Sequence, residues 1–432
     1  KEDHMENWTF DACNIEHFIQ LSPYALVYVL SAMLRLFAVT VHGTSYHGSH
    51  LVLRVAVYLT GLIVLETKQT QSRIARVIGH VSHDALNRLA QELTPCYDQL
   101  VLGVLLILDA LSPGYLILDD VLIPKPFAKY MCGAYPSYDH AQKRHVTGQR
   151  LVVLIWSNGV FCIPVAFVCW HHRQFIAHYR TKNELARILV YWTVRHHIPC
   201  RYLTFDNWYA SKQNLRCFTR LGLTFVTKLR YNAKVTGPSG GSKRPVSRFA
   251  RVKGHYYGAV DVYIIQFTVR YPGYGTGRLA VVTHDTHAES GRTKYLFTNA
   301  LTLTNREVLL RYRSRWAIEG FFRTCKQSFG LSACQAWMMP QVLLHIRLVF
   351  VAYTLTQFLV AEPTGAMEHT QTHLRSLACL TGPARRPVLV VQHLTGRLEP
   401  ITLATLLTPL RTRIPALQDV ALPTIQEIVD HP

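Results

Sequence analysis

The chain has 432 residues, too many for one ordinary hydrophobic core, so two or three domains are expected. Its 46 lysines and arginines against 26 aspartates and glutamates give a formal net charge of +20, which predicts a polyanionic partner, with a basic but merely solvated surface as the equal alternative. The ten cysteines form no C-x-x-C pair, which argues against a zinc site or a disulfide framework and favours reduced thiols in a cytoplasm.

Two apolar runs, residues 51–65 and 343–361, raise the question of a membrane span. Each contains an arginine, Arg54 or Arg347, and neither is comfortably long enough to cross a bilayer. Buried helices are therefore expected, and a membrane is not expected as a partner. No basic segment followed by an apolar stretch and a cleavage site is seen near the start, so no export signal is expected.

Residues 1–100 lack strand alternation and carry helical periodicity. A helix is predicted over 71–78, a break at Gly79, and a second helix over 82–93 with Ser82 as its N-cap. This pattern is typical both of helix-turn-helix DNA readers and of ordinary helical hairpins, and the DNA reader is slightly favoured. The cations available for phosphates are Arg73, Arg76 and Arg88.

Strand patterns begin at residue 115, with strands predicted over 115–119, 149–156 and 160–168. The last two are joined through Asn158 and Gly159, a pair that favours a hairpin with a type I′ turn because both residues tolerate positive φ.

Helices are then predicted over 183–197 and 211–221, each followed by a strand, at 201–205 and 224–229. The order of three strands, helix, strand, helix, strand predicts a mixed α/β sheet. Residues 230–303 show further strand patterns, near 260–270, 278–283 and 294–298, and no clear helix, which predicts an inserted β subdomain.

The segment that follows starts with a capping box, Thr304 to Glu307, and its helical periodicity predicts one helix as far as Gly330. A second apolar helix is predicted over 342–360. The C-terminal segment, 363–432, is left unassigned.

Acidic side chains follow two of the predicted strands: Asp119 and Asp120 end the first, and Asp206 ends the fourth. A carboxylate at the end of a buried strand is costly unless it is paired, hydrogen-bonded or bound to a cation. These residues therefore indicate a metal site, with turn or helix caps as the alternative for either position alone.

The predicted helix places Glu319 among cations. With Tyr312 at zero and about 100° per residue, Arg315 lies at about 300°, Glu319 at about 340°, Lys326 at about 320° and Arg323 at about 20°. A solvated row of ion pairs is the favoured explanation for this stripe by itself. Its combination with the two strand-end acids instead favours three carboxylates that converge on Mg²⁺, and two such ions about 4 Å apart would serve an in-line phosphoryl displacement.

These residues resemble the DDE transposases of bacterial insertion sequences, in the branch with the signature Tyr-x2-Arg-x3-Glu-x6-Lys. The segments that carry the resemblance are LILDDVLIPKP around Asp119, TFDNWYASKQNL around Asp206 and RSRWAIEGFFRTCKQSFGL around Glu319. The signature itself stands, with every spacing right, at Tyr312, Arg315, Glu319 and Lys326. The similarity extends over residues 50–360.

The resemblance implies a ribonuclease H-like core with a β insertion and catalytic, metal-binding roles for Asp119, Asp206 and Glu319. It also implies that Tyr312, Arg315 and Lys326 hold DNA phosphates, and Arg323 joins them as a DNA contact because it shares their stripe. Asp119 is chosen over Asp120 because adjacent side chains on a strand face opposite ways. The implied cofactor is two Mg²⁺ ions, with Mn²⁺ as a substitute.

Other residues are weaker candidates. Trp208 and Tyr209 are candidates for stacking on a base, but aromatic core packing is the commoner use. Lys125 and Lys129 are equally consistent with phosphate contacts and with a solvated loop. The histidines form no H-E-x-x-H motif, so none is assigned to a metal.

The predicted organisation is a helical, DNA-binding region (1–100), a ribonuclease H-like core (101–229), the β insertion (230–303), and core helices that carry the glutamate (304–362). The predicted function is a cytoplasmic, nucleoid-associated transposase that cuts double-stranded DNA at the inverted ends of its element and joins them to target DNA. A homodimer is a hypothesis, because two ends must be brought together. The alternatives are an inactive DNA-binding derivative and a metal-dependent nuclease that does not join.

Overall fold

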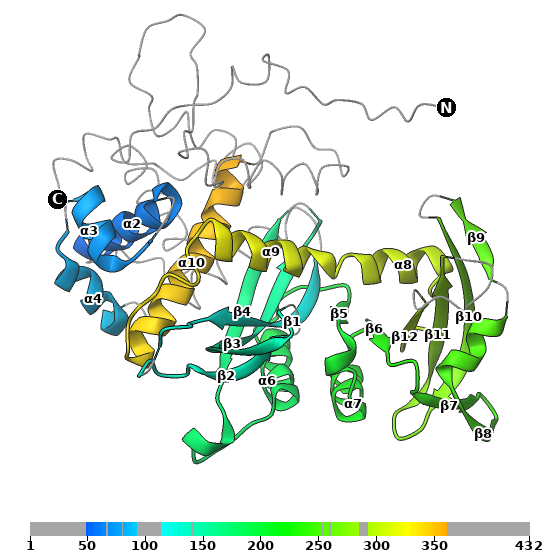
Figure 1. Ribbon diagram of the computed structural model, residues 1–432. Coiled ribbons are helices and arrows are strands. Elements are labelled where there is room, and N and C mark those ends of the chain that lie inside the picture. Colours follow the sequence, from blue (N-terminus) through cyan, green and yellow to red (C-terminus); the bar gives the residue numbers. More distant parts are fainter. Residues whose placement is uncertain are drawn as a thin grey trace, which may run out of the picture. The chain divides into compact units, whose positions relative to one another are not determined.

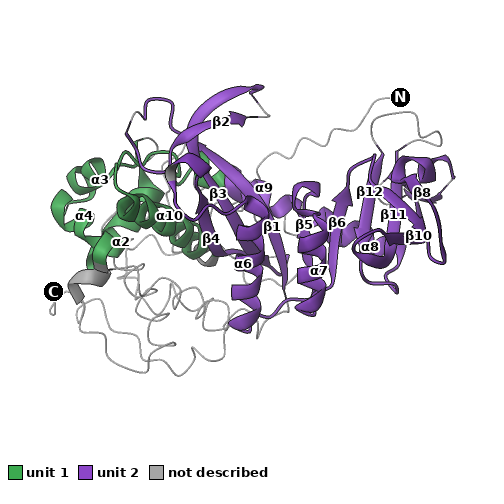
Figure 2. Ribbon diagram, turned by 90° about the horizontal axis from the view of Figure 1, so that it is seen from below, with its two compact units in different colours: residues 1–107, 324–432 green, residues 108–323 purple. Residues whose placement is uncertain are grey.

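The computed structural model describes residues 49–65, 68–79, 81–92, 114–128, 130–139, 142–159, 161–252, 254–258, 261–284 and 293–360. The chain divides into two compact units, residues 1–107 with 324–432 and residues 108–323 (Figure 2). The unassigned segment 363–432 and most of the first half of the predicted N-terminal region lie outside the described residues.

The unit of residues 108–323 is built on one large mixed sheet (Figure 1). Its central strands stand in the order β4, β3, β1, β5, β6: β3 is antiparallel to both β4 and β1, whereas β1, β5 and β6 run parallel. This mixed α/β arrangement is consistent with the ribonuclease H-like fold that was expected. The strands are β1 (Tyr115–Pro124), β3 (Arg144–Ser157), β4 (Cys162–Trp170), β5 (Leu203–Phe205) and β6 (Phe225–Leu229).

The strands between residues 230 and 303 continue this same sheet beyond β6. β12 pairs with β6, and β11, β10, β7 and β8 follow in that order, while β9 also pairs with β10. The predicted insertion is therefore β structure, but it is hydrogen-bonded to the core sheet. Its strands are β7 (Lys234–Gly237), β8 (Gly240–Pro245), β9 (His255–Tyr257), β10 (Val262–Tyr271), β11 (Gly275–Thr283) and β12 (Lys294–Thr298).

Two helices, α6 (Lys182–Arg195) and α7 (Lys212–Arg220), cover one side of the sheet, and they lie below it in Figure 1. α6 begins at a capping box formed by Thr181 and Glu184, and its apolar face packs on β3 and β4. The described residues of this unit also form the 3-10 helices η2 (Arg173–Phe175), η3 (Asn207–Tyr209) and η4 (Val246–Arg251).

The first strand is longer than predicted. β1 continues to Pro124, so that Asp119 and Asp120 lie in its middle, paired with Val153 and Val152 of β3. The expectation that they end the strand is therefore wrong. The reason is that β1 pairs along its whole length with β3, whose residues 148–153 are partners of residues 119–124, and the sequence of β1 alone does not show this pairing. β2 (Tyr135–Asp139), which the sequence pattern did not predict, pairs with the early part of β3.

The hairpin between β3 and β4 is present, but its turn differs from the expected type I′. Ser157 pairs with Cys162, which leaves a loop of residues 158–161. Gly159 has a φ of 93°, while Asn158 is not among the residues with positive φ. The Asn158 side chain instead accepts a hydrogen bond from the backbone N–H of Phe161 at 2.8 Å.

The helix after the sheet is divided into α8 (Asn305–Arg313) and α9 (Trp316–Gln327), and the single helix expected through Gly330 is wrong. α8 does begin at the predicted Thr304–Glu307 capping box. At the division the N–H groups of Arg315, Ala317 and Ile318 bond to carbonyls three residues back, at 3.1 to 3.2 Å. This tighter winding means that angles calculated at a uniform 100° per residue do not hold across it.

The described part of the other unit is helical, with α2 (Ser49–Val64), α3 (Gln71–Ile78), α4 (His83–Glu92) and α10 (Met339–Val360). The predicted pair of helices around Gly79 is confirmed, with the Ser82 hydroxyl accepting from the N–H of Ala85. Within α10, Met339–Gln357 is long and apolar enough to cross a membrane, but 72% of that stretch is buried, as in any core helix.

Candidate active site

The pairing of β1 with β5 brings Asp119 and Asp206 side by side. Leu118 is in register with Phe205 in this parallel pair, and an aspartate comes next in the chain in both cases, Asp119 within β1 and Asp206 directly after β5. Neighbouring strands lie about 4.8 Å apart. β5 ends at Phe205 while β1 continues, so the pairing between these two strands ends just before the two aspartates.

Asp119 is held by one backbone group and one cation. Its Oδ1 accepts from the backbone N–H of Asp120 at 2.8 Å, and its Oδ2 pairs with the Arg315 guanidinium at 3.0 Å. Burial and then the negative charge of Asp120 raise the pKa of Asp119 to about 7, even though Arg315 acts in the opposite direction. The charge of Asp206 adds a smaller contribution to the rise.

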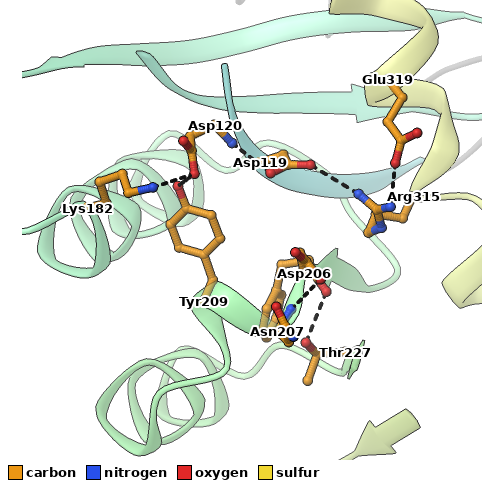
Figure 3. Close-up of polar contacts among 10 residues, drawn as sticks. Asp119, Asp120, Lys182, Asp206, Asn207, Tyr209, Thr227, Arg315 and Glu319 are labelled. Atoms are coloured by element: carbon orange, nitrogen blue, oxygen red, sulfur yellow. Dashed lines mark hydrogen bonds and ion pairs between the residues drawn. The ribbon is translucent and has the colours of Figure 1, made fainter. Parts of the chain in front are cut away.

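Arg315 joins the third carboxylate to this pair. Its second terminal nitrogen donates to Glu319, one turn further along the chain, so the guanidinium bridges Asp119 and Glu319 (Figure 3). The Arg315 Nε is buried and has no hydrogen-bond partner within the described part of the chain. Glu319 is therefore joined to Asp119 through an arginine and not directly.

Asp206 also serves as a turn cap, which was the alternative for this position. Its Oδ1 accepts from the N–H of Asn207 at 2.6 Å, at the start of η3. The strand before it is secured by Thr227 of β6, whose hydroxyl donates to the Phe205 carbonyl at 3.0 Å. A cap leaves the other carboxylate oxygen free of that bond, so the structural role and a binding role are compatible.

The donor chemistry of the site suits a divalent cation, but the carboxylates are not gathered around one position. All donors are carboxylate oxygens, which Mg²⁺ prefers, and the raised pKa of Asp119 reflects burial first and the neighbouring carboxylates second. Among the described residues, however, no group of three His, Cys, Asp or Glu side chains is arranged to hold a metal ion. The Arg315 guanidinium lies between Asp119 and Glu319, where it supplies positive charge.

Asp120 faces away from this cluster and is fully engaged. It pairs with Arg150 at 2.7 Å and Lys182 at 2.9 Å, and it accepts from the Tyr209 hydroxyl at 3.0 Å. Burial would raise the pKa of Asp120, but Lys182 and Arg150 outweigh it and hold this pKa below its usual value. This geometry favours Asp119, and not Asp120, as the site carboxylate.

The similarity to a known family covers the helices α2 to α4 and the part of the sheet unit from β1 to η4. Residues 52–251 match the family model described as DDE superfamily endonuclease. This part of the chain is similar to the DDE superfamily endonucleases. The similarity implies a transposase-like nuclease with DNA as substrate, in a family that generally uses divalent metals. No curated protein matches the chain.

The similarity to DDE endonucleases includes both aspartates and ends before the Tyr-Arg-Glu-Lys signature. Of the signature residues, Tyr312 is 8% exposed. The Cζ of Arg315 lies 6.0 Å from the centroid of the Tyr312 ring. Burial raises the pKa of Tyr312 to about 12, so this hydroxyl stays protonated at neutral pH. Further along α9, Arg323 is exposed and Lys326 half-buried. DNA contacts of these residues stay a prediction.

The structure separates the two aromatic candidates. Tyr209 is fully buried and bonded to Asp120, as core packing predicts, whereas Trp208 is 48% exposed. Lys125 is 5% exposed, so it does not lie in a solvated loop, and Lys129 lies outside the described residues.

Arg150 and Lys182 were missed by the sequence analysis. Arg150 starts the apolar run of β3 and Lys182 is the first residue of α6. The available indication was the Asp-Asp pair itself: if one carboxylate faces the site, its neighbour faces the other side of the sheet and needs cations there.

Proposed function

We propose that this chain is a metal-dependent DNA transposase, which cuts at the ends of its mobile element and joins them to target DNA. The observation that carries the proposal is the register of β1 and β5. It places Asp119 beside Asp206 in a stretch similar to DDE endonucleases, with Glu319 one arginine away. In this proposal the sheet unit is a ribonuclease H-like core, and Asp119, Asp206 and Glu319 are its catalytic carboxylates.

The proposed reaction is in-line phosphoryl transfer. Two Mg²⁺ ions, or Mn²⁺ in their place, would activate the attacking oxygen and stabilise the charge on the leaving one. Asp119, Asp206 and Glu319 would hold these ions. Tyr312, which stays protonated, can donate a hydrogen bond to a phosphate oxygen.

The proposed substrate is double-stranded DNA, first at the terminal inverted repeats and then at a target site. The formal net charge of +20 favours binding to phosphates, which Arg315, Arg323 and Lys326 would contact near the site. The α3 and α4 helices, with exposed Arg76 and Arg88, are proposed to bind the repeat. A homodimer that holds two ends, in the cytoplasm at the nucleoid, completes the proposal.

Each alternative has one observation in its favour. The matching family is described as an endonuclease, which also fits a nuclease that cuts without joining. The Arg315 bridge in place of a gathered carboxylate group also fits an inactive DNA-binding derivative.

Cleavage of a labelled duplex tests the proposal. The duplex carries the inverted repeat that flanks the gene, and cutting is measured in Mg²⁺, Mn²⁺ and EDTA for the wild type and Asp206→Asn. We expect cutting at the repeat end that needs the metal and is lost in the variant. Binding without any cutting by the wild type would support the inactive derivative.

Joining is tested separately, with pre-cut ends and a supercoiled target. Strand transfer supports the transposase, and cutting without strand transfer supports the nuclease. The Glu319→Gln variant should bind the duplex as the wild type does but neither cut nor join. Retained cutting by this variant would exclude Glu319 from the catalytic set.

A further inference from the structure

The turn after β5 holds Trp208 firmly although its side chain is exposed. On one side of it, Asp206 caps the turn through the N–H of Asn207 at 2.6 Å. On the other side, Tyr209 is fully buried and donates to Asp120 at 3.0 Å. Asn207 is thus fixed by the turn cap and Tyr209 by the sheet, so the exposure of the indole does not result from a loose loop.

The indole of Trp208 carries a cation on its ring. The Lys182 ammonium lies 4.3 Å from the ring centroid and is itself fixed at 2.9 Å from Asp120. Trp208 nevertheless remains 48% exposed, and it differs from the more exposed Trp337 in having this cation on its ring. The ring is therefore oriented by the protein while much of its surface stays available to a ligand.

The charges around the ring favour a polyanionic ligand. Asp120 is opposed by two cations, Arg150 and Lys182, so this group is positive overall. In the sequence, no aspartate or glutamate stands between Asp206 and Asp261, whereas lysines and arginines recur throughout that stretch. An apolar protein segment would need no such charge, whereas a DNA strand presents flat bases on a phosphate backbone.

We propose that Trp208 is a stacking site for an unpaired nucleobase of the DNA, with Lys182 holding the indole in place. This inference rests on the proposed function, because it assumes DNA at the neighbouring carboxylates. A base in a paired duplex is already stacked on both faces, so the site selects DNA that is single-stranded or opened close to the cleaved bond.

Fluorescence of 2-aminopurine tests the stacking without any cleavage. The probe is placed unpaired in the flanking-repeat duplex, next to the end, and the full-length protein is titrated in EDTA. We expect quenching with the wild type. Trp208→Leu should lower affinity for the unpaired DNA about tenfold, since base–aromatic stacking is worth roughly 1–3 kcal/mol by substitution. Its affinity for the fully paired duplex should be unchanged.

Two matched variants complete the test. Trp208→Phe keeps an aromatic face and should recover most of the quenching, which a purely structural role would not require. Trp337→Leu removes a tryptophan that is 69% exposed and should change nothing. Equal quenching and affinity for Trp208→Leu and the wild type would overturn the proposal, as would an equal loss in Trp337→Leu.

The test also separates this proposal from the proposed function. Quenching that depends on Trp208 in a protein that cuts no DNA would support the stacking site and reject catalysis. Metal-dependent cutting with no role for Trp208 would do the reverse. If Trp208→Leu does not fold, Trp208→Gln takes its place, because a position that is 48% exposed accepts a polar side chain, and it should show the same loss of quenching and of affinity for unpaired DNA.

Discussion

Asp119 lies where burial and two neighbouring carboxyl groups disfavour its negative charge. The pKa of Asp119 is raised to about 7 in the folded protein, whereas an unfolded aspartate ionises near 3.9. The folded protein therefore binds the extra proton between these values. Without metal, folding stability should fall as the pH rises from about 4 to about 7, by up to about 4 kcal/mol, and no further above that range.

Urea unfolding in EDTA checks this prediction. We expect Asp119→Asn to be as stable as the wild type near pH 4 and more stable near pH 8, because an amide does not ionise. Asp261→Asn is a matched control: this aspartate is exposed and its replacement should leave the pH dependence unchanged. If the free energy of unfolding changed equally with pH in the wild type and in Asp119→Asn, the Asp119 carboxyl would not be the cause of the pH dependence.

At the scale of elements, Asp120 ties four of them together. It stands on β1, Arg150 on β3, Lys182 at the start of α6, and Tyr209 in η3, directly after Asp206. The contact from Tyr209 sets where the Asp206 turn lies against β1. Residues that fix the spacing of Asp119 and Asp206 therefore lie on the opposite side of β1 from Asp119.

Loss of the hydrogen bond from Tyr209 to Asp120 should lower the free energy of unfolding more than loss of a similar hydrogen bond at the surface. Tyr209→Phe removes a buried hydrogen bond to a charged group and should destabilise the protein by about 1–3 kcal/mol. Tyr256→Phe removes a hydrogen bond of the same length, 3.0 Å, to Asp261 at the surface, and should have an effect below about 0.5 kcal/mol. Equal values in chemical denaturation would contradict a special role for the Tyr209 contact.

At the scale of the whole molecule, the sheet extends from the carboxylate cluster to a basic edge. β7 and β8 form its last hairpin, where Lys243 and Arg244 are exposed. If DNA contacts this edge, the logarithm of the binding constant should fall linearly with the logarithm of the salt concentration, with a slope of about 0.9 per phosphate neutralised. Changing both residues to glutamine should reduce the slope by roughly 1–2 in filter-binding or anisotropy titrations, and an unchanged slope would exclude this edge.

Local patterns were sufficient for many of the elements, although not for β2, β7, β8 and β9 or for the division between α8 and α9. The capping boxes at Thr181 and Thr304 define where α6 and α8 begin, and hydrogen bonds within four residues make them. The order of strands, helix, strand, helix, strand was also predicted from periodicity, with β2 as the one described strand missed before α6. These features depend on neighbours along the chain, so they can be recognised without knowledge of the fold.

What the sequence by itself determined is most of the helices and the longer strands, the positive charge and the three acids as candidates. The tertiary structure alone decided that β1 continues past Asp119, because β3 supplies the hydrogen bonds for it. It also decided that Arg315 separates Glu319 from Asp119, and that Asp120 finds its cations on β3 and α6. Each of these contacts joins residues far apart in the sequence, and no local periodicity records which distant strand or side chain will be the partner.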